Sequence, residues 1–368
     1  MVIKKNSQVN KPRVLLLGYL GANNLGDECM LYQLMTYLHR YDADISLASY
    51  GLGYEELELS VIYPHIIFKK RHRVKKRLLI GRILRNVDIV LWVGGNCFTD
   101  HDGDGGFDWL LIAKLLGKKF LYLGIGLDKL TKNERKIKMR IALNLCDRVI
   151  FRDQYSLRQG HDIIFAYKKI SYGKDLGELY IKEMPPEVMG KRKGILLSWR
   201  ELQNHMADQH FFLNRLSDEL IKFSKTYDEP VIIFETDDRV DLNVHEIIIA
   251  FFDKKGFNNY QHYTNLGLRN KLELIANSRC VITARLHTAV AAYLYGLPVA
   301  VFDYSQKITE LYNQYPQILK LDNSMKAFEK LFNEQSMPLI HNEEYSLDTT
   351  YTDILADYLS GSLKTVTS

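Results

Sequence analysis

The sequence predicts an α/β protein with two Rossmann-like, parallel-sheet domains that face a cleft. Three observations support this prediction. The chain has 368 residues, which is more than one ordinary hydrophobic core holds. Its composition, with 46% apolar and 25% charged residues, is typical of a globular protein. Short, fully apolar runs alternate with helical patterns along the chain, as in parallel sheets that helices cover on both faces.

The first domain is predicted over residues 1–180. A helix is expected from about residue 26 to residue 40, after the first strand and a glycine-rich turn. The strands of this domain are the apolar runs at 13–17, 88–93, 119–123 and 148–151.

The second domain is predicted over residues 190–345, because a new series of apolar runs begins after Gly194. Two adjacent prolines make 182–187 the best linker candidate. Residues 346–368 are expected to contain a C-terminal helix that could pack on either domain. The strands of the second domain are expected at 195–198, 231–234, 280–283 and 298–302, and its helices at 211–226, 268–277 and 286–294.

The positive charge of the chain is concentrated in one segment. Residues 69–85 contain nine Lys or Arg and no acidic residue, whereas the net charge of the whole chain is +5, so the remainder carries 5 − 9 = −4. Helical spacing of the leucines predicts an amphipathic basic helix. Such a helix is either an ordinary solvated face or a peripheral contact with an anionic membrane or acceptor. The segment lacks interleaved aromatic residues, which disfavours nucleic-acid binding.

Several sequence features favour a cytoplasmic protein, with membrane association through 69–85 left open. The charged N-terminus is followed by no hydrophobic region, and the longest apolar runs have the length of strands. The four cysteines lie far apart without a CxxC pair, which argues against a disulfide framework and a zinc knuckle.

The tripeptide Arg285-Leu286-His287 is the most informative motif. It lies between the predicted strand at 280–283 and the predicted helix at 286–294. Such a junction presents free backbone N–H groups and the positive end of a helix dipole. Arg285 adds a planar fork for phosphate or carboxylate, and His287 can transfer a proton near neutral pH. The motif therefore indicates chemistry on a small anion.

Other candidate residues also follow predicted strands, where open parallel sheets bind ligands. After the first strand, the loop with Asn24, Gly26 and Asp27 allows a tight turn and close ligand approach. It lacks both the GxGxxG and GK[ST] patterns, so it supports neither a dinucleotide site nor a Walker loop. Arg152 and Arg200 follow later strands, in positions equivalent to that of Arg285.

A further loop contains Gly94, Gly95 and Asp100, followed by His101 and an acidic stretch. Asp100, Asp102 and Asp104 match the first half of a calcium loop, but the twelfth position is Leu111 instead of glutamate. An acidic loop that faces a sugar is favoured, and whether residues 100–104 bind a metal stays open.

Eight segments follow one another along the chain in a characteristic order: residues 21–28, Val93-Gly-Gly95 with Asp100, Gly124-Ile-Gly126, Phe151-Arg-Asp153, Gly173-Lys-Asp175, 195–200, Arg285-Leu-His287 and Phe302-Asp-Tyr304 with Lys307. Together they resemble the polysaccharide pyruvyl transferase family over about residues 12–315. One departure from the family pattern is Asn96, which replaces the usual third glycine after Gly94 and Gly95, and another is the acidic insertion that follows.

The resemblance implies a GT-B-like fold and transfer of a pyruvyl group from phosphoenolpyruvate to a sugar of a cell-surface or exopolysaccharide precursor, giving a pyruvate ketal. His287 is then the expected general acid. Arg285 and Arg152 are expected to hold phosphate or carboxylate, with Arg200 and Lys307 as further candidates. Asp27 or Asp100 would orient the acceptor, and Asn24, Gly26, Gly94 and Gly95 would line the substrate site. The expected chemistry requires no metal and no cofactor.

Two alternatives remain at this point. One is a glycosyltransferase of the same architecture that uses a nucleotide sugar, for which Glu310 could bind the ribose hydroxyls. The other is an inactive sugar-binding relative, which is favoured if the arginines pair with internal acids. The acceptor could be a lipid-linked oligosaccharide, a nucleotide sugar or the end of a glycan.

Overall fold

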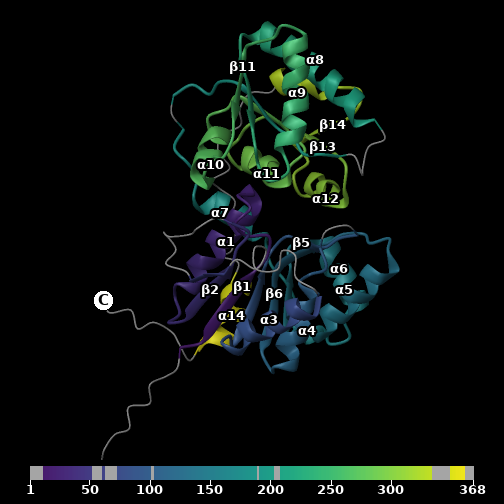
Figure 1. Ribbon diagram of the computed structural model, residues 1–368. Helices are drawn as coiled ribbons and strands as arrows, with labels where there is room; N and C mark the ends of the chain where they lie inside the picture. Colours follow the sequence, from purple (N-terminus) through teal and green to yellow (C-terminus); the bar gives the residue numbers. More distant parts are fainter. Residues whose placement is uncertain are drawn as a thin grey trace, which may run out of the picture. The chain divides into compact units, whose positions relative to one another are not determined.

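The chain forms two compact units, each built on one parallel sheet (Figure 1). Unit 1 comprises residues 1–20, 31–174 and 347–368, and unit 2 comprises residues 21–30 and 175–346. The computed structural model describes residues 11–51, 60–62, 73–100, 103–188, 190–202, 208–333 and 349–360.

The units divide the chain at different places from the predicted domains. The chain passes into unit 2 between Lys174 and Asp175, before the expected linker at 182–187. Residues 21–30 belong to unit 2, where the Leu25 N–H donates to the Thr236 carbonyl at 2.9 Å. Residues 347–368 belong to unit 1, where the Tyr351 hydroxyl donates to the Lys174 carbonyl at 2.7 Å.

The sheet of unit 1 has the strand order β3-β2-β1-β4-β6-β7-β8, with β5 paired to β6, and every pairing is parallel. The sequence prediction missed its short strands β2, β3, β5 and β8. The strands are β1 (Arg13–Leu17), β2 (Asp44–Ala48), β3 (Ser60–Ile62), β4 (Ile89–Val93), β5 (Asn96–Phe98), β6 (Lys119–Leu127), β7 (Arg148–Phe151) and β8 (Ile170–Tyr172).

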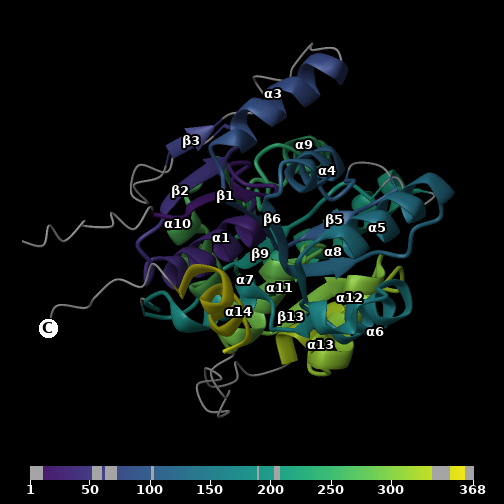
Figure 2. The same ribbon diagram turned by 90° about the horizontal axis from the view of Figure 1, so that it is seen from below.

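Helices cover both faces of this sheet. On one face, alternate strand residues such as Leu15 and Phe120 pack against α3, α4, α5 and α6. On the other face, Tyr37 of α1 stacks on Tyr351 of α14, and these two helices lie side by side (Figure 2). The helices are α1 (Leu25–Leu38), whose first residues belong to unit 2, α3 (Arg73–Arg85), α4 (Phe107–Leu115), α5 (Asn133–Leu145), α6 (Gln154–Ile163) and α14 (Thr350–Leu359).

The sheet of unit 2 has the strand order β11-β10-β9-β12-β13-β14, again with parallel pairings throughout. Four of its strands lie at the predicted positions, whereas β11 and β14 were not predicted. Every residue of the four predicted strands is buried, which explains their apolar sequences. The strands are β9 (Ile195–Ser198), β10 (Val231–Phe234), β11 (Tyr260–Tyr263), β12 (Cys280–Thr283), β13 (Val299–Phe302) and β14 (Leu319–Leu321).

Two hydrophobic clusters cover the faces of this second sheet. One contains Leu197 and Phe302 and includes side chains of α8, α9 and α13. The other contains Leu196 and Val301 and includes side chains of α7, α10, α11 and α12. The helices are α7 (Leu176–Glu183), α8 (Gln209–Tyr227), α9 (Leu242–Lys254), α10 (Leu268–Ala276), α11 (Leu286–Leu294), α12 (Gln306–Gln314) and α13 (Ala327–Asn333), and a short 3-10 helix of unit 1 spans Tyr167–Lys169.

In both units the strand order reverses next to the first strand of the sheet. This reversal lies between β1 and β4 in unit 1 and between β9 and β12 in unit 2. Open α/β sheets bind ligands at the carboxyl ends of strands at such a point. The loops that follow these strands contain most of the predicted site residues.

Candidate functional site

In unit 2, three adjacent strands direct basic side chains to the same edge of the sheet. Arg200 follows β9, Arg285 follows β12, and Tyr304 and Lys307 follow β13. Since β9, β12 and β13 are neighbours and parallel, their carboxyl ends lie together at the reversal of strand order.

Tyr304 is the centre of this group. Arg200 Nη1 donates to the Tyr304 hydroxyl at 3.2 Å, and the guanidinium carbon lies 5.4 Å from the ring centroid. Lys307 Nζ lies 5.6 Å from the same centroid. Burial alone would raise the pKa of Tyr304, but the charges of Lys307, Arg200 and Arg285 outweigh it and lower the pKa to about 8. We call Arg200, Arg285, Tyr304 and Lys307 the cation cluster.

The cation cluster has unused hydrogen-bonding atoms. Arg200 Nε, Arg285 Nε and Ser305 Oγ are buried and have no hydrogen-bond partner among the described residues. Ser305 precedes α12, but its side chain does not cap that helix. Within the same described ranges, no carboxylate forms an ion pair with Arg200 or Lys307. Surplus positive charge with buried, unsatisfied donors at helix N-termini is suited to a small anion.

Arg285 differs from the other cations because it has an internal partner. Its guanidinium forms an ion pair with the fully buried Asp241, and Arg285 itself is 8% exposed. Asp241 also accepts the N–H groups of Thr236 at 3.1 Å and Asp237 at 2.9 Å. Burial alone would lower the pKa of Arg285. The carboxylates of Asp241 and Asp237 outweigh this effect and raise the pKa above its ordinary value, so the guanidinium stays charged. The predicted Arg285 site is thus rigid and partly neutralised.

His287 forms a pair with Asp175. The imidazole Nε2 lies 3.3 Å from Asp175 Oδ1, and both side chains are 13% exposed. Asp175 is fixed as the N-cap of α7, because Oδ1 also accepts the N–H groups of Gly177 at 2.7 Å and Glu178 at 3.3 Å. A carboxylate in this position orients an imidazole.

Asp175 was not among the predicted site residues. The sequence does contain a capping signal in Asp175-Leu-Gly-Glu178, which predicts the start of a helix. Its proximity to His287, 112 residues away, has no signal in a single sequence.

Gly26 and Gly177 lie against the His287 imidazole. A Cβ on Gly26 would lie 1.9 Å from Nδ1 of His287, and a Cβ on Gly177 would lie 3.0 Å from Nε2. Asn24 fixes Gly26, since its Oδ1 accepts the N–H groups of Gly26 at 3.1 Å and Asp27 at 3.4 Å. The predicted residue Gly26 is therefore required for space beside the imidazole.

Residues 21–30 are anchored to unit 2 by polar contacts. Asn24 Nδ2 donates to Asp237 at 2.9 Å, and the Lys271 ammonium, which is fully buried, donates to the Asn23 carbonyl and to Asp238. Asp27 lies in the first turn of α1, as expected for an acidic residue at a helix start. In the sequence, nothing distinguishes Lys271 from a surface lysine on an amphipathic helix, so its buried position was not predicted.

In unit 1, Arg152 lies at the carboxyl edge of the sheet and is 9% exposed. Its guanidinium donates to the Oδ1 of Asn96, and the Nδ2 of Asn96 donates to Asp128 at 2.6 Å. Asn96, the residue that departs from the family pattern, thus positions Arg152. Gly94 and Gly95 both have positive φ, at 53° and 74°, and shape the turn between β4 and β5.

Asp100 has internal partners in unit 1. It accepts the Thr131 N–H and hydroxyl, both at 2.7 Å, and the Lys132 N–H at 3.0 Å. These hydrogen bonds lower the pKa of Asp100 to about 2. Asp100 therefore holds the segment before α5. The other predicted residues of this loop, His101 and Asp102, lie outside the described residues.

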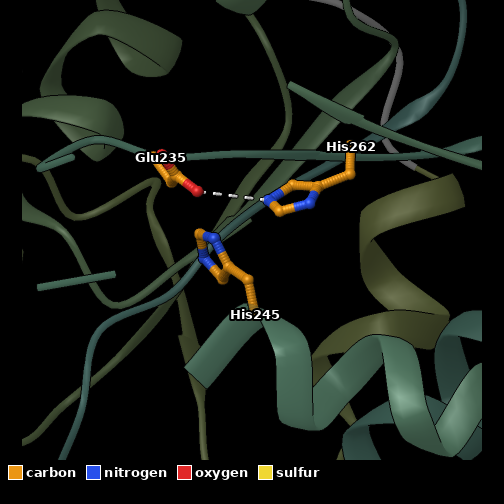
Figure 3. A group of neighbouring side chains, drawn as sticks. All are labelled: Glu235, His245 and His262. Carbon is orange, nitrogen blue, oxygen red and sulfur yellow. Dashed lines mark ion pairs between the residues drawn. The ribbon is translucent and has the colours of Figure 1, made fainter. Parts of the chain in front are cut away.

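A second titratable group in unit 2 consists of Glu235, His245 and His262 (Figure 3). One ligand atom of each residue lies within 4.8 Å of the other two, and His262 Nε2 lies 3.4 Å from Glu235 Oε1, the ion pair drawn in Figure 3. The Nδ1 atom of His245 is buried and has no hydrogen-bond partner in the described ranges. This residue set matches the ligand types of a transition metal.

The hydrogen bonding of His245 argues against a metal at this group. The Trp199 N–H donates to His245 Nε2 at 3.1 Å, so this nitrogen holds a lone pair. Burial, together with His262 and Arg285, lowers the pKa of His245 to about 3, and the neutral ring therefore has its proton on Nδ1. In this tautomer neither nitrogen of His245 offers a lone pair to a metal, because Nε2 accepts the Trp199 N–H and Nδ1 carries the proton. Burial, assisted by Asp238 and Asp241, raises the pKa of Glu235 to about 7.

Comparison with known proteins identifies the family of the chain. The model of the polysaccharide pyruvyl transferase family matches residues 24–306. A search of curated proteins found no significant match to the chain.

Solved structures with a similar fold include UDP-GlcNAc 2-epimerases and MurG. UDP-GlcNAc 2-epimerase from Methanocaldococcus jannaschii is 14% identical, with a TM-score of 0.66 over 94% of this chain and 99% of that chain. The Neisseria meningitidis UDP-GlcNAc 2-epimerase, solved with UDP-GlcNAc, is 14% identical, with a TM-score of 0.67 over 95% and 99% of the two chains. MurG from Acinetobacter baumannii is 13% identical, with a TM-score of 0.50 over 95% and 99%. These neighbours confirm the predicted GT-B-like class of two parallel-sheet α/β domains.

Proposed function

Because the chain belongs to the polysaccharide pyruvyl transferase family, we propose that it transfers the enolpyruvate-derived group of phosphoenolpyruvate to a sugar. The acceptor is a saccharide of a cell-surface or exopolysaccharide precursor, and the product is a pyruvate ketal. The reaction is proposed to take place in the cytoplasm, which agrees with four buried cysteines that are free thiols.

The cation cluster is the observation that carries this proposal. Phosphoenolpyruvate has a phosphate and a carboxylate close together, so it requires several donors in a small space. Arg200 and Lys307 supply charge that no described carboxylate balances, and the buried Arg200 Nε, Arg285 Nε and Ser305 Oγ supply free hydrogen-bonding atoms. The N-termini of α11 and α12 add favourable dipoles at the same edge of the sheet.

We assign the proton transfers to His287, which Asp175 orients. Protonated His287 donates its proton to the methylene carbon of the enol, and C2 becomes an oxocarbenium-like centre that the first sugar hydroxyl attacks. The imidazole then accepts the proton of that hydroxyl. Cleavage of the C2–O bond releases phosphate to the cation cluster, a second hydroxyl attacks C2, and its proton leaves with the phosphate. Of the two hydroxyl protons lost by the sugar, one balances the new methyl group and the other the released phosphate.

The two arginines held by internal partners have different proposed roles. Arg285, paired with Asp241, is proposed to be a rigid donor of hydrogen bonds from its Nε side. Arg152, which Asn96 holds in unit 1, stays a proposed contact for phosphate or carboxylate. An inactive sugar-binding relative would also be expected to pair Arg285 with an internal acid. Arg200 and Lys307, however, have no such ion pair among the described residues. Asp27, Gly94, Gly95 and Asp100 stay proposed acceptor-side residues.

A ligand-dependent stability measurement tests the donor. The melting temperature of the protein is compared with phosphoenolpyruvate, with UDP-GlcNAc and with free sugars. Selective stabilisation by phosphoenolpyruvate that the Arg200→Met variant loses supports the proposal. Stabilisation by UDP-GlcNAc alone would instead support the glycosyltransferase alternative, and stabilisation by free sugars alone would support an inactive sugar-binding protein.

A further inference from the structure

Three neighbouring helices of unit 1 form a strongly basic layer. Helices α3, α4 and α5 pack side by side over one face of the sheet (Figure 1). Their sequences contain eleven Lys or Arg but only two acidic residues, Asp108 and Glu134. Both acids are paired within the layer, Asp108 with Arg77 at 2.8 Å and Glu134 with Lys138 at 3.2 Å, and Asp147 outside it pairs with Lys114 at 2.8 Å. The layer's cations still outnumber these acids. We call the outer side of this layer the basic helical face.

The basic helical face also exposes a stripe of large apolar side chains on α5. Ile137, Ile141 and Leu145 lie one turn apart and are 59%, 40% and 39% exposed. The core-facing positions of the same helix are taken by Met139, Ala142 and Leu143. The stripe is therefore a second apolar surface on the outside of a helix that is already packed.

The other helices of the layer continue this pattern. Val74 and Leu78 of α3 are four residues apart and are 59% and 65% exposed, while Leu115 at the end of α4 is 85% exposed. Phe165, which follows α6, is 74% exposed, and its ring lies 5.4 Å from the Arg140 guanidinium carbon. Cations and large apolar side chains thus alternate over the face.

We propose that the basic helical face binds the surface of an anionic lipid bilayer. Lipid headgroups supply phosphate charges for the cations, and the acyl boundary takes up the protruding isoleucines and leucines, as in interfacial helices. The bilayer is a better fit than the other occupants. A second copy of this face would bring like charges together. Nucleic acid would meet its cations, but the large exposed apolar side chains described on α3, α4 and α5 are aliphatic, and the ring of Phe165 beside them does not form a series on which successive bases could stack.

The proposal extends the sequence-based expectation for residues 69–85. The described part of that segment is α3, whereas residues 69–72 lie outside the described residues. The apolar stripe of α5 and the exposed end of α4 were not foreseen, because they come from separate parts of the chain. No described helix is long and apolar enough to span a bilayer, so the proposed contact is peripheral.

Vesicle co-sedimentation of the full chain tests this proposal. The probes are phosphatidylcholine vesicles with and without phosphatidylglycerol, at low and at high salt. We expect binding only to the anionic vesicles. The charge variant Lys136→Glu/Arg140→Glu should reduce it by at least about tenfold at low salt. The apolar variant Ile137→Ser/Ile141→Ser should remove the part of the binding that persists at high salt.

A matched charge variant in unit 2, Lys225→Glu/Lys254→Glu, serves as the control, because both lysines are exposed. It should bind the anionic vesicles as the wild type does, and circular dichroism should show the same fold for all variants. Equal loss in the control would mean non-specific attraction and would overturn the proposal. Full vesicle binding by both face variants would also overturn the proposal. So would a result in which the protein does not bind vesicles but dimerises or binds RNA through the basic helical face.

Discussion

The imidazole of His287 lies directly against Gly26, so closely that a Cβ at position 26 would be 1.9 Å from its Nδ1. Gly26 has an ordinary helical backbone in α1, so alanine is permitted by the backbone but excluded by the imidazole. We predict that Gly26→Ala displaces His287 and lowers kcat for pyruvyl transfer by about a hundredfold, the cost of a misplacement near 1 Å. Steady-state kinetics of the purified variant measure this loss.

Gly81→Ala is the control for that variant. Gly81 lies within α3, and the nearest atom to an added Cβ is 3.8 Å away, which is ordinary contact. This substitution should leave kcat unchanged and should slightly stabilise the helix. Wild-type kcat in Gly26→Ala would show that the position of His287 is unimportant.

The Asp175–His287 pair gives a second prediction. In Asp175→Asn, the amide oxygen still caps α7, but the negative charge beside His287 is lost. Hydrogen bonds to a charged group contribute about 1.5–3 kcal/mol, so kcat should fall by roughly ten- to a hundredfold while KM for the donor changes little. A variant in which KM rises and kcat is kept would place Asp175 in substrate binding instead.

Tyr304 predicts a pH dependence of donor binding. Burial alone would raise the pKa of Tyr304, but the charges of Lys307 and Arg200 outweigh burial and lower it to about 8. Above pH 8 the phenol becomes a phenolate that competes with the substrate for these cations. The dissociation constant for phosphoenolpyruvate should therefore rise by up to about tenfold per pH unit above pH 8. Calorimetric titration should show this rise in the wild type and not in Tyr304→Phe; a rise in both proteins would exclude Tyr304 as its origin.

His245 predicts a pH dependence of stability. Its pKa is lowered to about 3 in the native state, mainly by burial, from an ordinary value of 6.5. Between these values the unfolded chain binds a proton that the native state excludes, so this residue's contribution to stability is lost as the pH falls. The loss is up to about 1.4 kcal/mol per pH unit. The raised pKa of Glu235, about 7, has the opposite effect on stability, because its contribution grows as the pH falls below 7.

The variant His245→Gln isolates this effect, because its amide oxygen can still accept the Trp199 N–H. Urea denaturation at pH 7, 6 and 5 should show a steeper loss of unfolding free energy in the wild type than in the variant. Parallel curves would mean that His245 is protonated in the native state, and the tautomer argument against a metal at this group would then fail.

The apolar strands could be predicted from the sequence because they are buried on both faces. Strands β9, β10 and β12 match their predicted ranges, and β13 lacks only Pro298. The edge strand β11 was missed because its residues Tyr260–Tyr263 are polar or aromatic and none is fully buried. Short strands such as β5 lack the length for a period-two pattern.

Only those parts of the candidate site that depend on residues close together in the sequence could be predicted. The strand-to-helix position of Arg285 and His287 follows from neighbouring residues, and the structure shows it. Their partners, Asp241 and Asp175, come from other elements, so a single sequence cannot indicate the pairing. For the same reason the role of Tyr304 was missed, although its charge environment depends on Arg200, about a hundred residues earlier in the chain.

We propose that this chain forms a pyruvate ketal with His287 as the proton donor. Mass spectrometry of candidate saccharide acceptors, incubated with phosphoenolpyruvate and either wild-type protein or His287→Ala, tests it most directly. The wild type should add one pyruvyl group with release of one phosphate per product, and His287→Ala should reduce the rate by about 10²–10⁴-fold while still binding phosphoenolpyruvate. Equal product formation by both proteins, or transfer of a sugar from UDP-GlcNAc in place of a pyruvyl group, would contradict the claim.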